Sequence, residues 1–172
     1  KKALIILAAS MAMSGLSAMA DDFKYDVIPM PKTISMAEKG HFQINAKTKI
    51  TFQDASLMKD AAFLAEFIQE ETGQRPEIKE GSQCRNSIDI NIDKNLDPEG
   101  YRMEIGKNGV RISAGAPAGA FYAAQTLRKS LAVTKVLPAA TIEDAPEFHY
   151  RGAHFDVSRH FFTVDEVKTY LD

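Results

Sequence analysis

The stretch YRMEIGKNGVRI, residues 101–112, decides the class of fold. Apolar side chains occupy every second position on both sides of Lys107-Asn108-Gly109, a pattern typical of strands with one buried face. An Asn-Gly pair is a strong hairpin signal, because both residues accept the positive φ angles of a tight turn. The stretch therefore predicts two antiparallel strands joined by a tight turn. The apolar positions are Tyr101, Met103, Ile105, Val110 and Ile112.

Segments on either side of this hairpin predict the rest of a compact domain. Residues 87–93 alternate in the same way, and two short runs at 42–44 and 50–52 are typical of further strands. Helical spacing of apolar residues predicts one helix over 56–72, which Gly73 ends, and a second over 117–131. The order is strands, helix, strands, helix, with hairpins between strands. We therefore expect an α+β domain with a mainly antiparallel sheet.

The character of the sequence changes after Pro138. Residues 139–149 show little periodicity and are interpreted as a linker, and residues 150–156 as a strand. Thr163 and Glu166 have the spacing of a capping box, which predicts that a helix begins there. A strand, a loop and a capped helix form the opening βα unit of an α/β domain, so a second domain is expected to begin after the first.

The first twenty residues are typical of a secretory signal peptide. Lys1 and Lys2 precede a short apolar run, and Ala18-Met19-Ala20 has the form of a cleavage site before Asp21. The other interpretation is an amphipathic or buried N-terminal helix. The apolar run is too short and too interrupted to span a membrane. We expect cleavage before Asp21, a periplasmic or secreted protein, and no membrane anchor after cleavage. The chain lacks an initiator methionine and stops at Asp172 within a predicted helix, so both ends are interpreted as those of a fragment.

Composition excludes several classes of function. The 172 residues are 45% hydrophobic and 26% charged, which is enough apolar surface for a folded core. The formal net charge is −2, whereas nucleic-acid binders usually carry a basic excess, so no nucleic-acid partner is expected. A single cysteine, Cys84, excludes an internal disulfide and a thiolate zinc cluster. There is no tryptophan.

Arg159 is the candidate substrate-binding residue. It lies in the loop after the predicted strand 150–156 and before the capped helix. If this unit opens a (β/α)₈ barrel, the loop lies at the end where active sites are built. A guanidinium there offers a planar set of donors to hydroxyls or carboxylates. The alternative is a structural ion pair, for example with Asp156, and the residues alone leave both interpretations open.

A metal site, a phosphate loop and a cysteine nucleophile are weaker candidates. His154, Asp156 and His160 lie close together but lack a recognised ligand spacing, so no metal is assigned. Gly115 and Gly119 lack the lysine of a phosphate-binding loop, which makes close helix packing the better interpretation. Cys84 stands in a polar stretch and is interpreted as a surface or half-buried thiol rather than a nucleophile.

Several ordered motifs together resemble one enzyme family. The stretch YRGAHFDVSRHFF closely resembles the start of the catalytic barrel in family 20 glycoside hydrolases, the β-N-acetylhexosaminidases. Other stretches resemble the opening and close of the family's N-terminal domain and the joint between its domains. The resemblance spans essentially the whole chain after the signal peptide. The stretches are residues 150–162, 27–31 with 40–42, 99–101 with 118–127, and 142–148.

This resemblance implies a domain organisation and an activity. Residues 21–145 would form a zincin-like domain, an antiparallel sheet with two helices that binds no catalytic zinc. Residues 146–172 would begin a (β/α)₈ barrel. The family removes terminal N-acetylglucosamine or N-acetylgalactosamine from glycans with retention of configuration. The substrate's own acetamido oxygen is the nucleophile and no cofactor is needed. The arginine that matches Arg159 binds hydroxyls of the terminal sugar.

The catalytic residues implied by the family are not among these residues. The resemblance places the Asp-Glu catalytic pair and the pocket tryptophans downstream of Asp172, so the parent protein is the expected enzyme and the 172-residue chain is expected to be inactive. The alternative is a non-catalytic carbohydrate-binding or docking module ending near residue 145. A relative of zinc proteases is a third and weaker reading, because the sequence has no HExxH motif.

Overall fold

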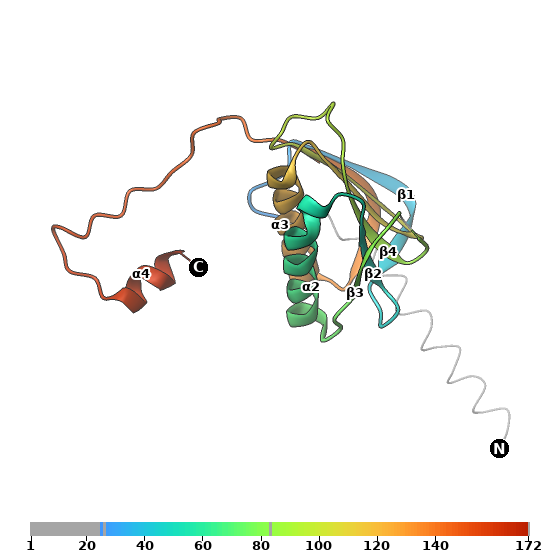
Figure 1. Cartoon of the computed structure of the whole chain (residues 1–172), viewed down its shortest axis with the longest axis horizontal. Coiled ribbons are helices and arrows are strands. Elements are labelled where there is room, and N and C mark those ends of the chain that lie inside the picture. The colour runs from blue at the N-terminus through green and yellow to red at the C-terminus, as the bar shows by residue number, and fades with distance from the viewer. Residues whose placement is uncertain (1–24, 26, 83, 172) are drawn as a thin grey trace, which may run out of the picture.

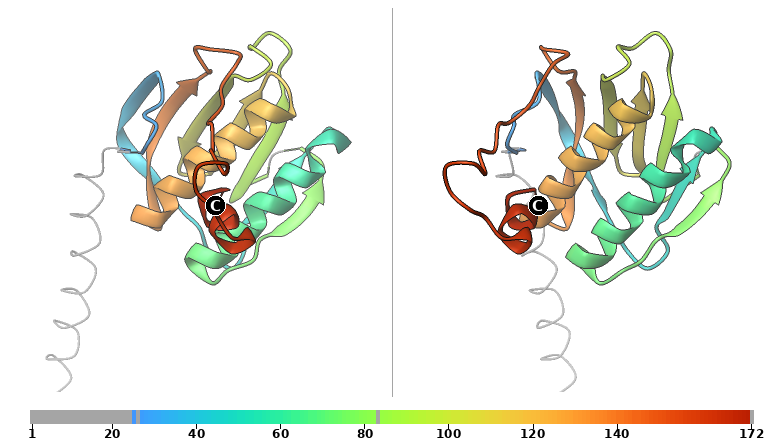
Figure 2. Two further views of the ribbon diagram at one scale, coloured as in Figure 1. Left: turned by 90° about the vertical axis from the view of Figure 1, so that its left-hand side faces the viewer. Right: turned by 60° about the vertical axis from the view of Figure 1, so that its left-hand side comes forward.

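A single seven-stranded sheet covered on one face by two helices makes up most of the molecule (Figures 1 and 2). The computed structural model describes residues 25, 27–82 and 84–171. The predicted signal peptide, residues 1–20, lies outside the described residues. None of the helices in the described part of the chain is long and apolar enough to cross a membrane.

The elements follow one another along the chain as seven strands and three helices in the described residues, with one turn of 3-10 helix. The strands are β1 (Thr33–Gln43), β2 (Lys49–Phe52), β3 (Glu77–Glu80), β4 (Ser87–Ile92), β5 (Tyr101–Gly106), β6 (Gly109–Ala114) and β7 (Val136–Asp144). The helical elements are η1 (Ala55–Leu57), α2 (Met58–Thr72), α3 (Pro117–Val133) and α4 (Val164–Leu171).

The sheet is mixed, with the strand order β1-β7-β5-β6-β4-β2-β3. Strands β1, β7, β5 and β6 pair antiparallel, whereas β6, β4, β2 and β3 pair in parallel. The prediction of a mainly antiparallel sheet is therefore wrong for half of the sheet. One reason is that α2 forms a crossover between β2 and β3, which returns the chain to the same end of the sheet and makes the two strands parallel; β4 also pairs in parallel with β2 and β6, which are not consecutive with it along the chain.

The predicted hairpin is confirmed. Strands β5 and β6 pair in register from Tyr101 opposite Ala114 to Gly106 opposite Gly109. The two residues between the strands are Lys107 and Asn108, so the turn lies one residue before the Asn-Gly pair. Gly109 has a φ of +149°, and a Cβ there would lie 2.2 Å from the carbonyl oxygen of Ser87 in β4. Glycine is thus required both for the backbone angle and for the close approach of β4.

Both predicted helices of the first domain are confirmed. Helix α2 ends at Gly73, whose φ of +73° and N–H bond to the Gln69 carbonyl form a left-handed C-terminal cap. Helix α3 begins with Pro117, where the missing N–H costs no helical hydrogen bond. The apolar sides of both helices pack with the sheet in one core. Its fully buried members include Phe52, Leu57, Leu64, Ile68, Ile88, Ile90, Met103, Ile112 and Leu127.

Strand β7 corrects the predicted linker at 139–149. Residues 139–144 belong to this strand, which lies between β1 and β5. Four consecutive residues from Leu137 to Ala140 are buried, so the strand has no alternation of apolar and polar positions there. Pro138 cannot donate to a neighbouring strand, but its carbonyl accepts a 2.6 Å hydrogen bond from the hydroxyl of Tyr25. The linker begins only after Asp144.

The predicted strand at 150–156 is not formed. These residues are extended and mostly exposed, and no strand of the described residues lies beside them to complete a backbone ladder. In Figure 1 the chain after β7 runs away from the sheet and ends in α4. Helix α4 has no buried residue. The predicted capping box is confirmed: the Glu166 carboxylate accepts from the Thr163 N–H at 2.7 Å, and the Glu166 N–H donates to the Thr163 hydroxyl at 3.3 Å.

Candidate functional site

The Arg159 loop is organised by Asp156. One carboxylate oxygen of Asp156 accepts from the backbone N–H of Ser158 at 2.9 Å and of Arg159 at 3.3 Å. The other oxygen lies 3.3 Å from Nε of Arg159. The Arg159 side chain is 91% exposed, so this ion pair is well solvated and contributes little to stability. Asp156 thus shapes the loop while most of the guanidinium faces solvent.

Aromatic rings hold this loop beside α4. The ring of Phe155 stacks on Tyr170 with centroids 4.5 Å apart and meets Phe162 at 4.7 Å. His160 lies edge-on to Phe162 at 5.1 Å. The described residues contain no group of three or more His, Cys, Asp or Glu side chains placed to hold a metal ion. Of the three residues, Asp156 shapes the turn and His160 contacts an aromatic ring.

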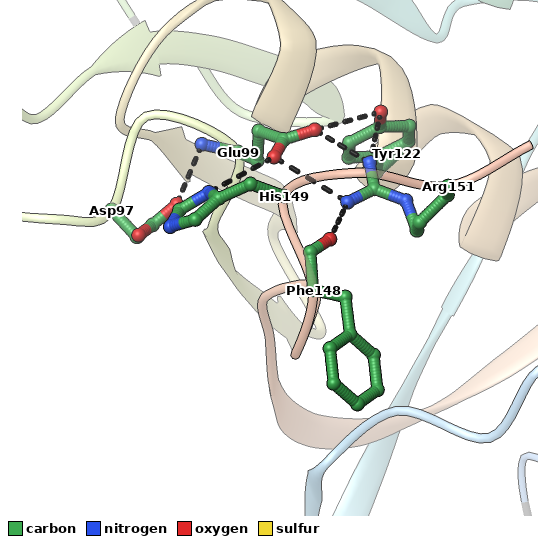
Figure 3. A network of polar contacts seen from close by, with 6 residues as sticks. All are labelled: Asp97, Glu99, Tyr122, Phe148, His149 and Arg151. Atoms are coloured by element: carbon green, nitrogen blue, oxygen red, sulfur yellow. Dashed lines mark hydrogen bonds and ion pairs between the residues drawn. The ribbon is translucent and has the colours of Figure 1, made fainter.

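A second polar constellation joins the segment after β7 to the sheet domain (Figure 3). The guanidinium of Arg151 contacts both carboxylate oxygens of Glu99, with Nη2 2.5 Å from Oε1 and Nη1 3.4 Å from Oε2. The hydroxyl of Tyr122 donates to Glu99 at 3.1 Å and accepts from Arg151 at 2.9 Å. His149 Nδ1 lies 3.8 Å from the same carboxylate. We call Glu99, Tyr122 and Arg151 the Glu99 cluster.

Charge pairing sets the protonation of this cluster. The Arg151 guanidinium, which donates to the carboxylate, holds the pKa of Glu99 below its usual range, and the Tyr122 hydroxyl adds to this effect. The same contact with Glu99 raises the pKa of Arg151. Both groups are therefore charged at neutral pH, and the contact is a charge-assisted pair with two nitrogen–oxygen contacts.

Close backbone packing brings the cluster together. Glu99 lies in the turn between β4 and β5, and Tyr122 lies on the second turn of α3. A Cβ on Gly119 would lie only 2.2 Å from the carbonyl oxygen of Gly100, so the helix touches the turn directly. The absence of a side chain at residue 119 is what lets Tyr122 reach Glu99.

A hollow of about 560 Å³ opens beside the Glu99 cluster. Apolar side chains of Met30 and Phe121 line it together with the polar heads of Lys32 and Gln125. Arg159 is not among its lining residues, so the structure does not bring the predicted substrate-binding residue to this hollow. Sequence reasoning missed the Glu99 cluster as a unit. The available signal was that its three members each fall within a stretch that carries the family resemblance.

The fold by itself defines the class of this protein, an α+β domain followed by a separate segment. A mixed seven-stranded sheet with two helices on one face forms a complete α+β domain, and the segment that follows it carries a loop with an exposed arginine. The sequence model described as "Glycosyl hydrolase family 20, domain 2" matches residues 24–145, and the chain belongs to this family.

Two curated relatives illustrate the match. The β-hexosaminidase of Porphyromonas gingivalis is 29% identical, and the alignment covers 98% of this chain and 23% of the relative. The β-N-acetylhexosaminidase of Cellulomonas fimi is also 29% identical, over 84% of this chain and 31% of the relative. The chain thus spans about a quarter to a third of the length of these relatives.

Solved structures share the fold. The N-acetyl-β-hexosaminidase of Streptomyces plicatus, in complex with thio-NAglucal, is 32% identical with a TM-score of 0.72, over 87% of this chain and 32% of that one. The exo-β-N-acetylglucosaminidase of Vibrio harveyi is 25% identical with a TM-score of 0.69, over 84% of this chain and 23% of that one. Both proteins carry the sheet domain within a much longer chain.

Proposed function

We propose that this chain is the N-terminal part of a secreted β-N-acetylhexosaminidase. The parent protein hydrolyses terminal non-reducing N-acetylhexosamine residues with retention, by substrate-assisted catalysis. The observation that carries the proposal is the match of residues 24–145 to a domain of this family, together with relatives named β-hexosaminidases. A Streptomyces plicatus relative has been solved with the product GlcNAc, which supports the class of substrate.

The family resemblance implies a division of labour within the parent, which we include in the proposal. Residues 21–145 form an accessory domain of the zincin-like type, and residues 146–172 contribute the first βα unit of the catalytic (β/α)₈ barrel. The Asp-Glu pair that orients the acetamido group and protonates the leaving oxygen lies outside these residues. Continuation of the reading frame beyond Asp172, with such a pair and pocket tryptophans, is expected. A stop codon directly after Asp172 would favour a docking module instead.

Arg159 is proposed to bind hydroxyls of the terminal sugar. Its backbone is held by the turn that Asp156 makes, its contact with Asp156 is made by Nε, and its side chain is 91% exposed, which leaves the guanidinium accessible to a ligand. A planar pair of donors matches two neighbouring hydroxyls, which a lysine ammonium cannot reproduce from one rigid plane. Asp156 then restrains the guanidinium for this task.

The test is the Arg159→Lys variant of the full-length parent. Hydrogen bonds to charged groups contribute about 1.5–3 kcal/mol each, so kcat/KM should fall roughly ten- to several-hundred-fold while the protein stays folded. Arg102→Lys is the matched control, because Arg102 makes an exposed ion pair with Glu143 on the sheet and should leave kcat/KM unchanged. A lowered Tm with nearly intact kcat/KM for Arg159→Lys would mean that the residue only braces the loop.

Two further measurements test the remaining parts of the proposal. The pure 172-residue chain should not hydrolyse an aryl N-acetyl-β-glucosaminide above background, and hydrolysis that is abolished by mutating one of its carboxylates would overturn the assignment. Mass spectrometry of exported protein should find a mature N-terminus at Asp21. Exported protein that retains Lys1 and Lys2 would reject the signal peptide.

A further inference from the structure

Among the described residues, the segment that carries Arg159 makes its polar contacts with the sheet domain at one place. Polar contacts from the described residues after Ala145 reach back to the sheet domain at Glu99 and Tyr122 (Figure 3). Beyond Arg151, the segment is stabilised by its own contacts, namely the Asp156 turn, the rings around Phe155 and the capping box. The position of the whole segment therefore depends on the Glu99 cluster.

The Glu99 carboxylate is presented by a rigid turn. Its own N–H donates to the Asp97 carboxylate at 2.9 Å, and the N–H of Gly100 donates to the Asp97 carbonyl at 2.8 Å. The carbonyl of Gly100 accepts from Gly115 at 3.0 Å and touches Gly119 of α3. The backbone on both sides of Glu99 is thus fixed, and its side chain is only 24% exposed.

Tyr122 holds the carboxylate from the side of α3. Its hydroxyl bonds both Glu99 and Arg151, so it closes a three-membered network. Its ring centroid lies 5.6 Å from the guanidinium carbon of Arg151, within the range of a cation–π contact. The sheet domain therefore offers a carboxylate, a hydroxyl and a ring face, all in place to receive one guanidinium.

Arg151 connects this receptor to the linker in two ways. Its guanidinium contacts both oxygens of Glu99, and Nη1 also donates to the carbonyl of Phe148 within its own segment. The side chain therefore fixes both its own position on the sheet domain and the fold of the linker just before it. A lysine could supply the charge but not this forked set of donors.

We propose that Glu99 is a positioning residue: together with Tyr122 it receives Arg151 and fixes the path by which the chain leaves the sheet domain toward the Arg159 loop. About fourteen residues separate Ala145 from Arg159, but only about eight separate Arg151 from it. Since an extended residue spans at most about 3.6 Å, the contact shortens the free tether of the loop from about 50 Å to about 29 Å. This inference concerns the path of the chain and goes beyond the sugar contact proposed above.

Backbone ¹⁵N relaxation of the 172-residue chain tests the inference directly. In the wild type, order parameters of residues 148–152 should lie near 0.85, the value of rigid backbone, and in Glu99→Gln they should fall below about 0.6. The control is Glu143→Gln, which removes the carboxylate partner of Arg102 at 3.3 Å on the sheet and should leave residues 148–152 unchanged. Order parameters of the sheet strands should stay the same in both variants.

A second variant guards against misfolding and against a purely stabilising ion pair. Arg151 is on the partly exposed side of the contact, so Arg151→Lys should fold normally. The variant keeps the charge but should also lower the order parameters of residues 148–152. A salt bridge that only stabilises the fold would lower the Tm without changing these residues selectively. Order parameters that remain near 0.85 in both variants, or that are already below 0.6 in the wild type, would overturn the proposal. Because no sugar is involved, the result is independent of the activity proposed for the parent.

Discussion

Replacing Gly119 by alanine tests the close approach that builds the Glu99 cluster. A Cβ at this position would lie 2.2 Å from the carbonyl oxygen of Gly100 and 3.0 Å from its carbonyl carbon. Ordinary carbon–oxygen contacts begin near about 3.3 Å, so the helix and the turn must separate by about 1 Å. Both contacted atoms belong to the backbone, and no side-chain rotation can relieve the overlap.

The expected size of the effect follows from two opposing terms. Alanine is the better helix former and gains at most about 1 kcal/mol over glycine. Overpacking a close contact costs about 1–3 kcal/mol, and a backbone–backbone overlap belongs at the upper end of that range. We therefore expect Gly119→Ala to lower the free energy of unfolding by about 1–2 kcal/mol, and the Tm by roughly 4–8 °C.

Urea unfolding followed by circular dichroism measures this difference. Ala118→Gly is the matched control, because Ala118 is exposed on the same turn of α3, so its replacement should cost at most about 1 kcal/mol through propensity alone. The reasoning is refuted if Gly119→Ala is more stable than the wild type, since that sign would mean that only propensity acts at this position.

Three further predictions concern alkaline pH, acidic pH and the C-terminal segment. Burial raises the pKa of Tyr101 to about 12 from its usual 10, so the unfolded chain loses this proton first and stability should fall as pH rises above 10. Two pH units at about 1.4 kcal/mol each give a loss of about 2.7 kcal/mol. A series of Tm measurements between pH 9 and 12 should show this loss in the wild type but not in Tyr101→Phe. The pKa of Glu99 is lowered in the folded state, so its pairing with Arg151 stabilises the fold above the ordinary glutamate pKa, and this stabilisation is lost as pH falls through the lower folded value. An NMR titration should give a Glu99 midpoint below about 4.3 in the wild type and a higher midpoint in Arg151→Gln. A midpoint that is the same in both would contradict the pairing. Because α4 buries no residue, a chain ending at Ala145 should unfold cooperatively in urea, with a midpoint no lower than that of Arg151→Gln in the 172-residue chain, since both lose the pair with Glu99; a clearly lower midpoint would show that the segment is an integral part of the core.

Local pattern predicted the elements that have one buried face. The alternation of Ile88, Ile90 and Ile92 and the hairpin at 101–112 both appear as strands, and the apolar spacing of α2 and α3 places their buried sides against the sheet. In β5, β6 and the two helices the sequence period matches the geometry, because one side meets the core and the other is more exposed. Strand β4 alternates in sequence too, although Ser87 and Asp89 on its other face are also buried.

Pairing partners and fully buried segments could not be predicted in this way. Alternation is identical in parallel and antiparallel strands, so nothing in residues 87–92 tells that β4 runs parallel to β2 and β6. The run from Leu137 to Ala140 is buried throughout and has no period to detect. Strand β3, with three charged residues among its four, resembles a loop. The direction of β4, the burial of residues 137–140 and the formation of β3 all depend on tertiary contacts.

The residues of the candidate site also differ in how far sequence could predict them. Arg159 was found through a family motif that lies within one short stretch of sequence. In the Glu99 cluster, Tyr122 is 23 residues from Glu99 and 29 residues from Arg151, and Arg151 is 52 residues from Glu99. The packing of Gly119 on Gly100 brings Glu99 and Tyr122 together, and that contact depends on the absence of a side chain rather than on a visible signal.

The two outer strands of the sheet bear on how the isolated domain behaves at high concentration. An open sheet edge invites a strand of another molecule to extend it. Strand β3 is only four residues long and carries Glu77, Lys79 and Glu80, so an incoming strand would meet charge at nearly every position. At the opposite edge, β1 loses its regular register between Met36 and His41, where Gly40 has a φ of +113°. Neither edge thus offers a second molecule a long, regular and uncharged ladder, so we expect the domain to resist edge-to-edge aggregation when it is concentrated.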